Sequence, residues 1–199
     1  MIKNSRNSDF LIDPMFLDRW SPRAFGDDKI SENELFTLLE AARWAPSAFN
    51  TQPWHFIYAR RATPAFDRLL NLLIEFNRSW AKRAAALIVI VSEKAPGPDK
   101  SVHSHSHSFD AGAAWGFLAL QALRLGWHTH GMTGIDFTRA AKELAVPDTH
   151  RLEAALAIGR LGDKSLLPEK LRAREEPSQR KPLAAIISEG IFQSPPAGA

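Results

Sequence analysis

The sequence predicts a layered domain built from both helices and strands, of the α+β or the α/β class. Short aromatic and β-branched runs bounded by turn residues are typical of strands, and stretches with apolar residues at helical spacing lie between them. The stretches between the predicted strands vary in character, and both ends of the chain look like arms. Because no internal repeat and no linker is visible, residues 1–199 are predicted to form a single domain.

The clearest predicted helix begins at Ser31, which opens the sequence Ser-Glu-Asn-Glu. This pattern has the form of a capping box, in which the serine and the second glutamate bond to each other's backbone. Apolar residues follow at the spacing of one helical face, and Pro46 ends the helix. A second helix is predicted after Thr63, because threonine is a good N-cap and Pro64 suits the first helical position. The residues after it that share one stripe are Phe66, Leu69, Leu70, Leu73 and Asn77.

Three more helices are predicted, near residues 10–17, over 109–125 and over 137–144. Gly126 is a typical C-terminal cap of the second, and Asp136 can cap the third at its start. Gly112 and Gly116 are expected to allow close packing of a buried helix. Strands are predicted over 54–59, 87–91, 127–130 and 152–158.

The composition favours a protein of the cytoplasm. Of the 199 residues 45% are hydrophobic, the formal net charge is +3, and there is no cysteine, which excludes disulfides and thiolate sites. The N-terminus lacks the apolar run of a signal peptide, and the longest apolar run, 84–91, is too short to span a bilayer. We therefore expect a cytoplasmic protein with no membrane partner.

Three histidines alternate with serines in the low-complexity stretch over residues 99–108. His103, His105 and His107 would share one side only if the segment were extended. A metal ion needs further ligands in a fixed geometry, and no matching set of carboxylates is nearby. We expect a mobile loop here and no metal site.

Common catalytic and nucleotide-binding motifs are absent. No Gly-x-Gly-x-x-Gly follows a predicted strand, and no Walker-type phosphate loop, serine elbow or His-Glu-x-x-His sequence occurs. Chemistry that needs a side-chain dyad is therefore not indicated.

The stretch 45–54, Ala-Pro-Ser-Ala-Phe-Asn-Thr-Gln-Pro-Trp, connects a predicted helix to a predicted strand. Two prolines stiffen it, and Ser47, Asn50 and Gln52 offer polar groups between them, as expected of a binding loop on a firm scaffold. Basic segments occur at 19–25 and 180–183. Since arginines suit phosphate and stiff polar loops suit a flat heterocycle, the three segments together could hold a phosphorylated aromatic cofactor.

These segments resemble those of the FMN-dependent nitroreductase-like flavoproteins. The resemblance rests on Arg-Trp-Ser-Pro-Arg-Ala-Phe at 19–25, on the stretch 45–54, on the segment 131–136 and on Arg-Lys-Pro-Leu at 180–183. Order and spacing match from about residue 15 to residue 190, and the string Pro-Ser-x-x-Asn-x-Gln-Pro-Trp is the most specific part.

The resemblance implies an α+β, three-layer fold with a central, mainly antiparallel sheet flanked by helices. It also implies a homodimer with exchanged terminal arms and FMN bound at the subunit interface. Asn77 would correspond to a residue that contacts the flavin ring, and Trp80 stands where some relatives carry a basic residue. The residues implied to bind the cofactor are Arg19, Trp20, Ser21, Arg23, Pro46, Ser47, Asn50, Gln52, Asn77, Thr133, Gly134, Arg180 and Lys181.

In this reading Arg19, Ser21 and Arg180 bind the FMN phosphate, and Arg23 lies near the N1–O2 edge of the ring. Backbone amides at Thr133 and Gly134 lie near N5 and O4. Pro46, Ser47 and Asn50 come from the partner subunit and line the flavin. The function implied is hydride transfer from NAD(P)H to a nitroaromatic or quinone-like acceptor by a ping-pong mechanism. The flavin carries the chemistry, so no catalytic side chain is expected.

Two other readings stay open at this point. An enzyme of the same fold could bind flavin and perform another reaction, such as flavin destruction or a dehydrogenation. A basic nucleic-acid-binding protein is disfavoured, because the charge excess is small and no recognition motif is present.

Overall fold

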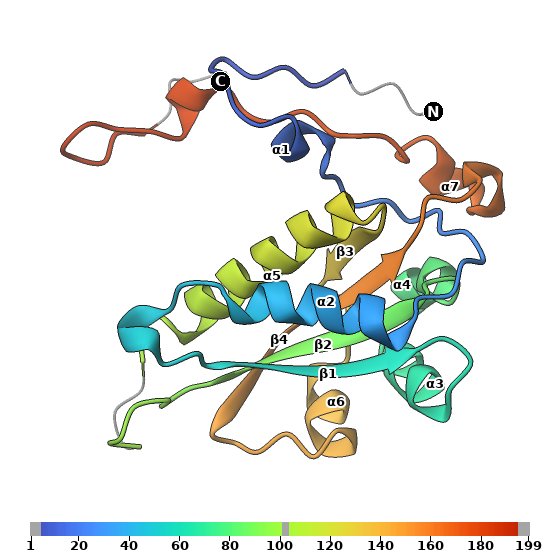
Figure 1. Ribbon diagram of the computed structural model, residues 1–199, viewed down its shortest axis with the longest axis horizontal. Helices are drawn as coiled ribbons and strands as arrows, with labels where there is room; N and C mark the ends of the chain where they lie inside the picture. The colour runs from blue at the N-terminus through green and yellow to red at the C-terminus, as the bar shows by residue number, and fades with distance from the viewer. Residues whose placement is uncertain (1–4, 101–103, 195–199) are drawn as a thin grey trace.

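The computed structural model describes residues 5–100 and 104–194. Four strands form one antiparallel sheet in the order β1-β2-β4-β3, with helices on both faces (Figure 1). The α+β alternative is therefore the correct one, and the expected three-layer arrangement is confirmed. The strands are β1 (Trp54–Arg60), β2 (Ala86–Glu93), β3 (His128–Met132) and β4 (His150–Gly159).

Seven α-helices and three short 3-10 helices lie in the described part of the chain. The α-helices are α1 (Met15–Asp18), α2 (Glu32–Arg43), α3 (Pro64–Asn71), α4 (Glu75–Ala81), α5 (His107–Arg124), α6 (Phe137–Glu143) and α7 (Glu169–Arg172). The 3-10 helices are η1 (Ala48–Asn50), η2 (Lys164–Leu166) and η3 (Leu183–Ala185).

Strand β2 is the centre of the hydrophobic core because both of its faces are covered. Side chains alternate along a strand, so its residues divide between two clusters. Ile88 and Ile90 pack with Leu35 and Leu38 of α2 and with the buried side of α5. On the other face, β2 packs against α3, α4 and α6; the residues there include Leu87, Val89, Phe66, Leu69, Trp80 and Ala140.

The predicted caps form as the sequence indicates. The Ser31 hydroxyl accepts from the Glu34 backbone N–H, and the Glu34 carboxylate accepts from the Ser31 N–H, which completes the capping box of α2. Thr63 caps α3 by accepting from the backbone N–H of Phe66, and Asp136 caps α6 in the same way. Gly126 ends α5 with a φ of 73°, in the left-handed region that favours glycine.

Two predicted helices differ in the structure. The helix near residues 10–17 is reduced to α1, because 10–12 is an irregular and exposed stretch. The stripe from Phe66 to Asn77 belongs to two helices, since the chain leaves the helical path between α3 and α4. There the Ile74 N–H donates to the Gly134 carbonyl and the Asp136 N–H donates to the Leu72 carbonyl. These bonds replace a helical turn with a β-bridge between Leu73 and Ile135.

The prediction for the glycines of α5 was wrong. A Cβ atom added to Gly112 or Gly116 would meet no atom within 4 Å, so both face outward instead of into the core. They form an exposed stripe with Phe109 and Phe117, whose side chains are 80% and 43% exposed. Within the described part of the chain, helix α5 therefore has one buried side and one exposed, apolar side.

The two ends of the chain run side by side along one edge of the molecule (Figure 1). The Arg6 Nε donates to the Ser178 carbonyl over 2.8 Å, and the Gln179 amide donates to the Ser5 carbonyl over 3.3 Å. Several apolar side chains on these arms are exposed, including Leu11, Ile191 and Phe192. Among the described residues, no helix has both the length and the apolar character to cross a membrane.

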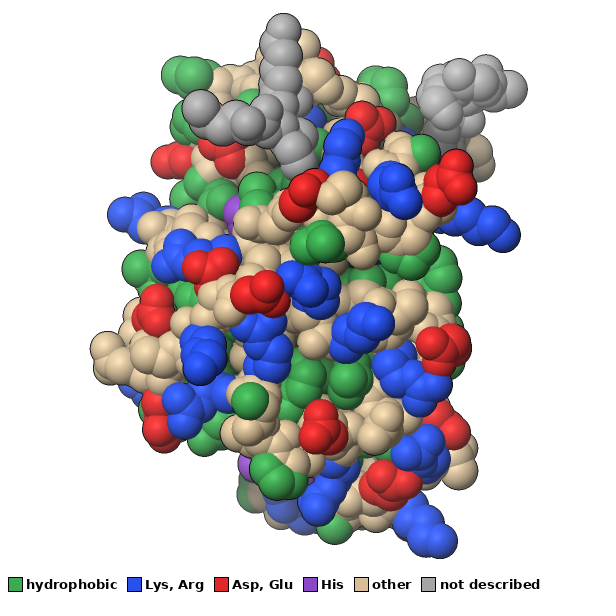
Figure 2. All heavy atoms as spheres, turned by 90° about the vertical axis from the view of Figure 1, so that its right-hand side faces the viewer, with side chains coloured by type: hydrophobic (Ala, Val, Ile, Leu, Met, Phe, Trp, Pro, Cys, Tyr) green, Lys and Arg blue, Asp and Glu red, His purple; other side chains and the backbone are tan. Residues whose placement is uncertain are grey.

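Basic and acidic side chains are interspersed on the side of the molecule that Figure 2 shows. Asp27 pairs with both Arg61 and Arg83, over 3.6 and 2.9 Å. These two basic side chains are therefore paired with a carboxylate of the same chain.

Candidate functional site

Arginine side chains from three separate segments converge on one pocket of about 410 Å³. We call it the arginine pocket. One part comes from the loop after α1, one from the segment after α7, and one from the N-terminal segment. The residues that line it are Arg6, Arg19, Trp20, Ser21, Arg23, His130, Ala173, Arg174, Glu176, Ser178 and Arg180. Five of the sequence-predicted site residues therefore meet in one chain: Arg19, Trp20, Ser21, Arg23 and Arg180.

The arginine pocket is strongly positive, and its guanidinium groups repel one another. Burial lowers the pKa of Arg19, and the nearby Arg180 lowers it further. Burial also lowers the pKa of Arg23; the Glu175 carboxylate opposes that effect and Arg174 adds to it. Guanidinium groups stay protonated despite such shifts, so the pocket favours an anion that can offset their repulsion.

Ser21 and Trp20 shape the loop side of the pocket. The Arg19 Nη1 donates to the Ser21 hydroxyl over 3.3 Å, which places a second polar group beside the guanidinium. Trp20 is buried and lies edge-on to His128, with ring centroids 6.4 Å apart. Arginine and hydroxyl donors together match the oxygen-rich surface of a phosphate group.

His130 also lines the pocket and was missed by the sequence analysis. Its Nδ1–H donates to the Pro22 carbonyl over 3.0 Å, and its ring lies 4.6 Å from that of Trp80. Burial lowers its pKa to about 4, so the imidazole is neutral at pH 7. The sequence pattern that could have identified His130 is its spacing from His128. The two histidines are two residues apart on a predicted strand and therefore lie on one face.

Trp80 is a core residue that supports His130. Its side chain is 2% exposed and packs between Phe25 and His130. The indole Nε1 is buried and has no hydrogen-bond partner within the described part of the chain. A neutral, buried ring therefore occupies this position.

Asn77 lies one helical turn before Trp80 and contacts the segment after β3. Its Nδ2 donates to the Gly134 carbonyl over 3.1 Å. A Cβ on Gly134 would lie 2.3 Å from that nitrogen, so only glycine fits here without movement. The structure thus brings Asn77 and Gly134 together, with Thr133 exposed beside them.

Lys181 lies outside the arginine pocket. It lines a neighbouring depression of about 300 Å³, which also contains Arg6 and Arg180. Its charge can still contribute to the field of the pocket, but the structure gives it no shared wall with Arg19 or Ser21.

The loop over 45–54 does not meet the arginine pocket in the same chain. Phe49, Asn50 and Gln52 have φ angles of 51°, 54° and 47°, a left-handed conformation that is rare for residues other than glycine. The Ser47 hydroxyl accepts from the Gln52 N–H over 3.0 Å, and the Gln52 amide donates to the Asn50 carbonyl over 3.1 Å. In Figure 1 this loop is the cyan turn between α2 and β1 at the left of the molecule, whereas α7 lies at the right.

The loop is instead exposed beside an apolar groove. Phe49 is fully exposed, and Pro46, Asn50 and Gln52 are exposed as well. Ala48 and Phe49 form one wall of a groove of about 540 Å³, opposite Pro96 and Pro98. Strained backbone held in an exposed loop is typical of binding segments.

No group of three or more metal-ligating side chains occurs among the described residues. His105 lines the apolar groove, and His107 begins α5 with its Nδ1 2.8 Å from the Ser92 hydroxyl. His103 lies outside the described residues.

Comparison with known proteins identifies the family. The model of the nitroreductase family matches residues 17–79, a region that holds Arg19–Arg23, the loop over 45–54 and Asn77. The crystal structure of an oxidoreductase containing FMN is 46% identical in sequence and superposes with a TM-score of 0.93, covering 98% of this chain and 99% of that one. The chain belongs to the nitroreductase family.

Other relatives of this nitroreductase-family chain match shorter regions. An uncharacterised 15.4 kDa protein of Mycolicibacterium smegmatis is 33% identical over 138 residues, 69% of this chain and 90% of that protein. The oxygen-insensitive NADPH nitroreductase of Helicobacter pylori is 36% identical over 66 residues, 33% of this chain and 30% of that enzyme. This chain is therefore an oxidoreductase by family.

Three further residues of the site lay beyond sequence reasoning. Arg6, Arg174 and Glu175 are in the terminal segments, where no periodic pattern fixes their position. Only the fold shows that these segments reach the loop over 19–25.

Proposed function

We propose that this nitroreductase-family chain binds FMN and transfers a hydride from NAD(P)H to an electron-poor acceptor, nitroaromatic or quinone-like. The observation that carries the proposal is the arginine pocket, with five arginines and a serine from segments that are separate in sequence. It is supported by the 46% identical oxidoreductase, which contains FMN.

The residues of the pocket fit the phosphate of FMN. Arg19, Arg180 and the Ser21 hydroxyl would hold the phosphate oxygens, since guanidinium groups bind phosphate through paired hydrogen bonds. Burial lowers the pKa of Arg19 and repulsion from Arg180 lowers it further; a bound dianion would offset that repulsion. Glu176 is the acidic residue that lines the pocket, so the excess of positive charge there is large.

Other residues would hold the ring. When bound, the flavin supplies the hydride chemistry at N5 and carries negative charge near N1 and O2 after reduction. Arg23 would stabilise that charge, and backbone amides at Thr133 and Gly134 would orient the ring. Asn77 fixes that segment through its bond to the Gly134 carbonyl. No side chain is assigned a role as acid or base.

A second copy of the chain would complete the site. Pro46, Ser47, Asn50 and Gln52 belong to the loop beside the apolar groove and do not line the arginine pocket, so one chain does not bring all of the predicted residues together. The exposed stripe of α5 and the exposed apolar residues of the arms are surfaces that a partner could cover. We propose a homodimer in which the loop over 46–52 lines the flavin of the other subunit.

The visible spectrum of the purified protein tests the proposal. We expect yellow protein that releases one FMN per subunit on denaturation and oxidises NAD(P)H when a nitroaromatic is added. Initial rates at several concentrations of both substrates should give the parallel lines of ping-pong kinetics. Colourless protein that takes up no added FMN would refute the proposal. FMN binding without turnover of nitroaromatic or quinone would favour another flavin reaction on the same fold.

A further inference from the structure

Glu175 is buried in a segment that is otherwise largely exposed. Its side chain is 1% exposed, whereas Arg174 and Glu176 on either side of it are exposed. A carboxylate loses much hydration when it is buried, so it stays there only if hydrogen bonds or charges compensate. The contacts of Glu175 therefore show what holds this segment in place.

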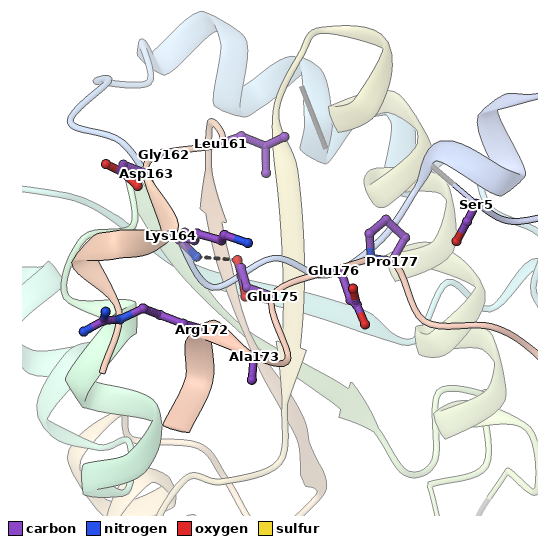
Figure 3. Close-up of a pocket in the computed structure, with 11 residues that line it drawn as sticks. Ser5, Leu161, Gly162, Asp163, Lys164, Arg172, Ala173, Glu175, Glu176 and Pro177 are labelled. Atoms are coloured by element: carbon purple, nitrogen blue, oxygen red, sulfur yellow. Dashed lines mark hydrogen bonds between the residues drawn. The ribbon is translucent and has the colours of Figure 1, made fainter. Parts of the chain in front are cut away.

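Those contacts join the segment to the backbone of the arginine loop. One carboxylate oxygen, Oε1, accepts from the backbone N–H groups of Arg23 and Ala24, each over 2.7 Å. The other oxygen, Oε2, lies 4.0 Å from the Arg23 Nη1 and has no hydrogen-bond partner within the described chain. Figure 3 shows Glu175 pointing toward this loop, with the bond from Ala24 drawn as a dashed line.

The segment on which Glu175 lies carries half of the arginine pocket. This segment contributes Arg174, Ser178 and Arg180 to the pocket. The loop whose backbone bonds to Glu175 contributes Arg19, Ser21 and Arg23. Ala173 and Glu176 line the arginine pocket and also a second cavity of about 560 Å³ behind the segment (Figure 3). Cavities lie on both sides of the segment. Its bonds to the N-terminal arm, at Ser178 and Gln179, are exposed, so the more buried Glu175 bonds are a main attachment.

We infer that Glu175 is a positioning residue that ties the segment with Arg174 and Arg180 to the loop with Arg19 and Arg23, and so holds the two halves of the phosphate pocket together. It does not line the arginine pocket, and acts through the backbone of Arg23 and Ala24. The inference rests on the proposed function only in taking the FMN phosphate as the anion.

Positioning and simple electrostatics predict opposite results for one substitution. Glu175→Gln removes a negative charge 4.0 Å from the Arg23 guanidinium, so electrostatics alone predicts tighter binding of an anion. The same change replaces one of the two carboxylate oxygens by an amide N–H₂ group. If it replaces Oε1, the amide faces the backbone N–H groups of Arg23 and Ala24; if it replaces Oε2, it faces the Arg23 guanidinium. A donor then faces a donor, the segment loosens, and the anion binds more weakly.

The test compares full-length wild type, Glu175→Gln, Glu175→Asp and the control Glu169→Gln. Glu169 is an exposed carboxylate of α7, so its substitution makes the same change in net charge away from the pocket. FMN titration should show affinity reduced at least about tenfold in Glu175→Gln, by loss of a charged hydrogen bond. Glu175→Asp keeps the charge but shortens the reach, and should also weaken binding. The control should match wild type.

A second readout uses ligand-free protein. Trypsin should cleave after Arg180, a bond that the substitution does not alter, at least about five times faster in Glu175→Gln than in wild type, because local opening becomes more frequent. Equal cleavage rates, or FMN affinity equal to or above that of wild type, would overturn the inference. If wild type binds no FMN, the proposed function fails, and the proteolysis rates together with affinity for inorganic phosphate still decide the role of Glu175.

Discussion

The side-chain amide of Asn77 donates a 3.1 Å hydrogen bond to the carbonyl oxygen of Gly134 and so connects helix α4 to the segment after β3. The same carbonyl accepts from the backbone N–H of Ile74. Two segments that are 57 residues apart in sequence are thereby held in one geometry. In the proposed enzyme this geometry sets the position of the backbone amides that face the flavin ring.

Substitution of Gly134 by alanine should disturb that connection. The new Cβ would lie 2.3 Å from the Asn77 Nδ2 and 2.8 Å from the Ile74 Cδ1, so one of the groups must move. We expect the free energy of unfolding to fall by about 1–3 kcal/mol, as for loss of a buried hydrogen bond with local strain. Urea unfolding measures this. Gly97→Ala is the control, because a Cβ there meets nothing within 4 Å, and equal stability of the two variants would contradict the prediction.

Arg19→Ala should weaken FMN binding through the phosphate. We expect the dissociation constant for FMN to rise at least about tenfold, the value of one charged hydrogen bond. Binding of riboflavin, which lacks the phosphate, should change less than about twofold by the same reasoning. Fluorescence titration with both ligands separates a lost phosphate contact from a general defect. Arg124→Ala, an exposed arginine at the end of α5, controls for net charge.

Gly116→Leu should weaken the proposed dimer without harming the fold. No described residue lies within 4 Å of a Cβ at this position, and leucine favours a helix more than glycine does, by up to about 1 kcal/mol. If a partner packs on this stripe, the larger side chain separates the two surfaces. Sedimentation equilibrium should show a dimer dissociation constant raised at least about tenfold. Lys142→Leu on α6 is the matched control, and an unchanged dimer would place the interface elsewhere.

Stability should decrease as the pH falls from about 6.5 to about 4. Burial lowers the pKa of both His128 and His130 to about 4. An unfolded histidine has a pKa near 6.5, so between these values the unfolded chain binds more protons and is favoured. Each histidine can remove up to about 3 kcal/mol of stability over this range. Above about pH 6.5 the effect vanishes, because both states are neutral.

His130→Asn tests the assignment, since asparagine can keep the bond to the Pro22 carbonyl and does not titrate. Chemical unfolding of ligand-free protein at several pH values should give a shallower decline for this variant than for wild type. The exposed His55 provides the control His55→Asn. Parallel curves for His130→Asn and wild type would refute the contribution of His130.

Much of the fold follows from local sequence signals. The capping box at Ser31, the cap at Thr63 and the β-branched run in β2 are short-range patterns, and each forms as predicted. The strand order β1-β2-β4-β3 is not encoded locally, because antiparallel partners are chosen by packing of distant segments. The break between α3 and α4 was missed for the same reason, since it depends on bonds to Gly134 and Asp136.

The candidate site also combines residues that the local sequence predicts with residues that only the fold brings to them. Arg19, Ser21 and Arg23 are close in sequence, so a phosphate site could be predicted there, and the fold adds Arg180 as expected. Arg6 and Arg174 lie in arms without periodicity, so only tertiary structure places them. The sequence also could not show that Gly112 and Gly116 face outward. A pair of glycines four residues apart has the same sequence pattern whether the surface that packs on it belongs to the same chain or to another one.

The loop over 46–52 and the arginine pocket are separate in one subunit, and this allows a complementation experiment with two variants. In the proposed homodimer, two variants with different substitutions should complement each other, because each would supply the part of the site that the other lacks. An Arg19→Ala chain mixed with an Asn50→Ala chain would form some dimers with one wholly intact site and one doubly damaged site. Random mixing of equal amounts puts half of the dimers in this class, which predicts wild-type affinity at about a quarter of the FMN sites, although neither parent has an intact site.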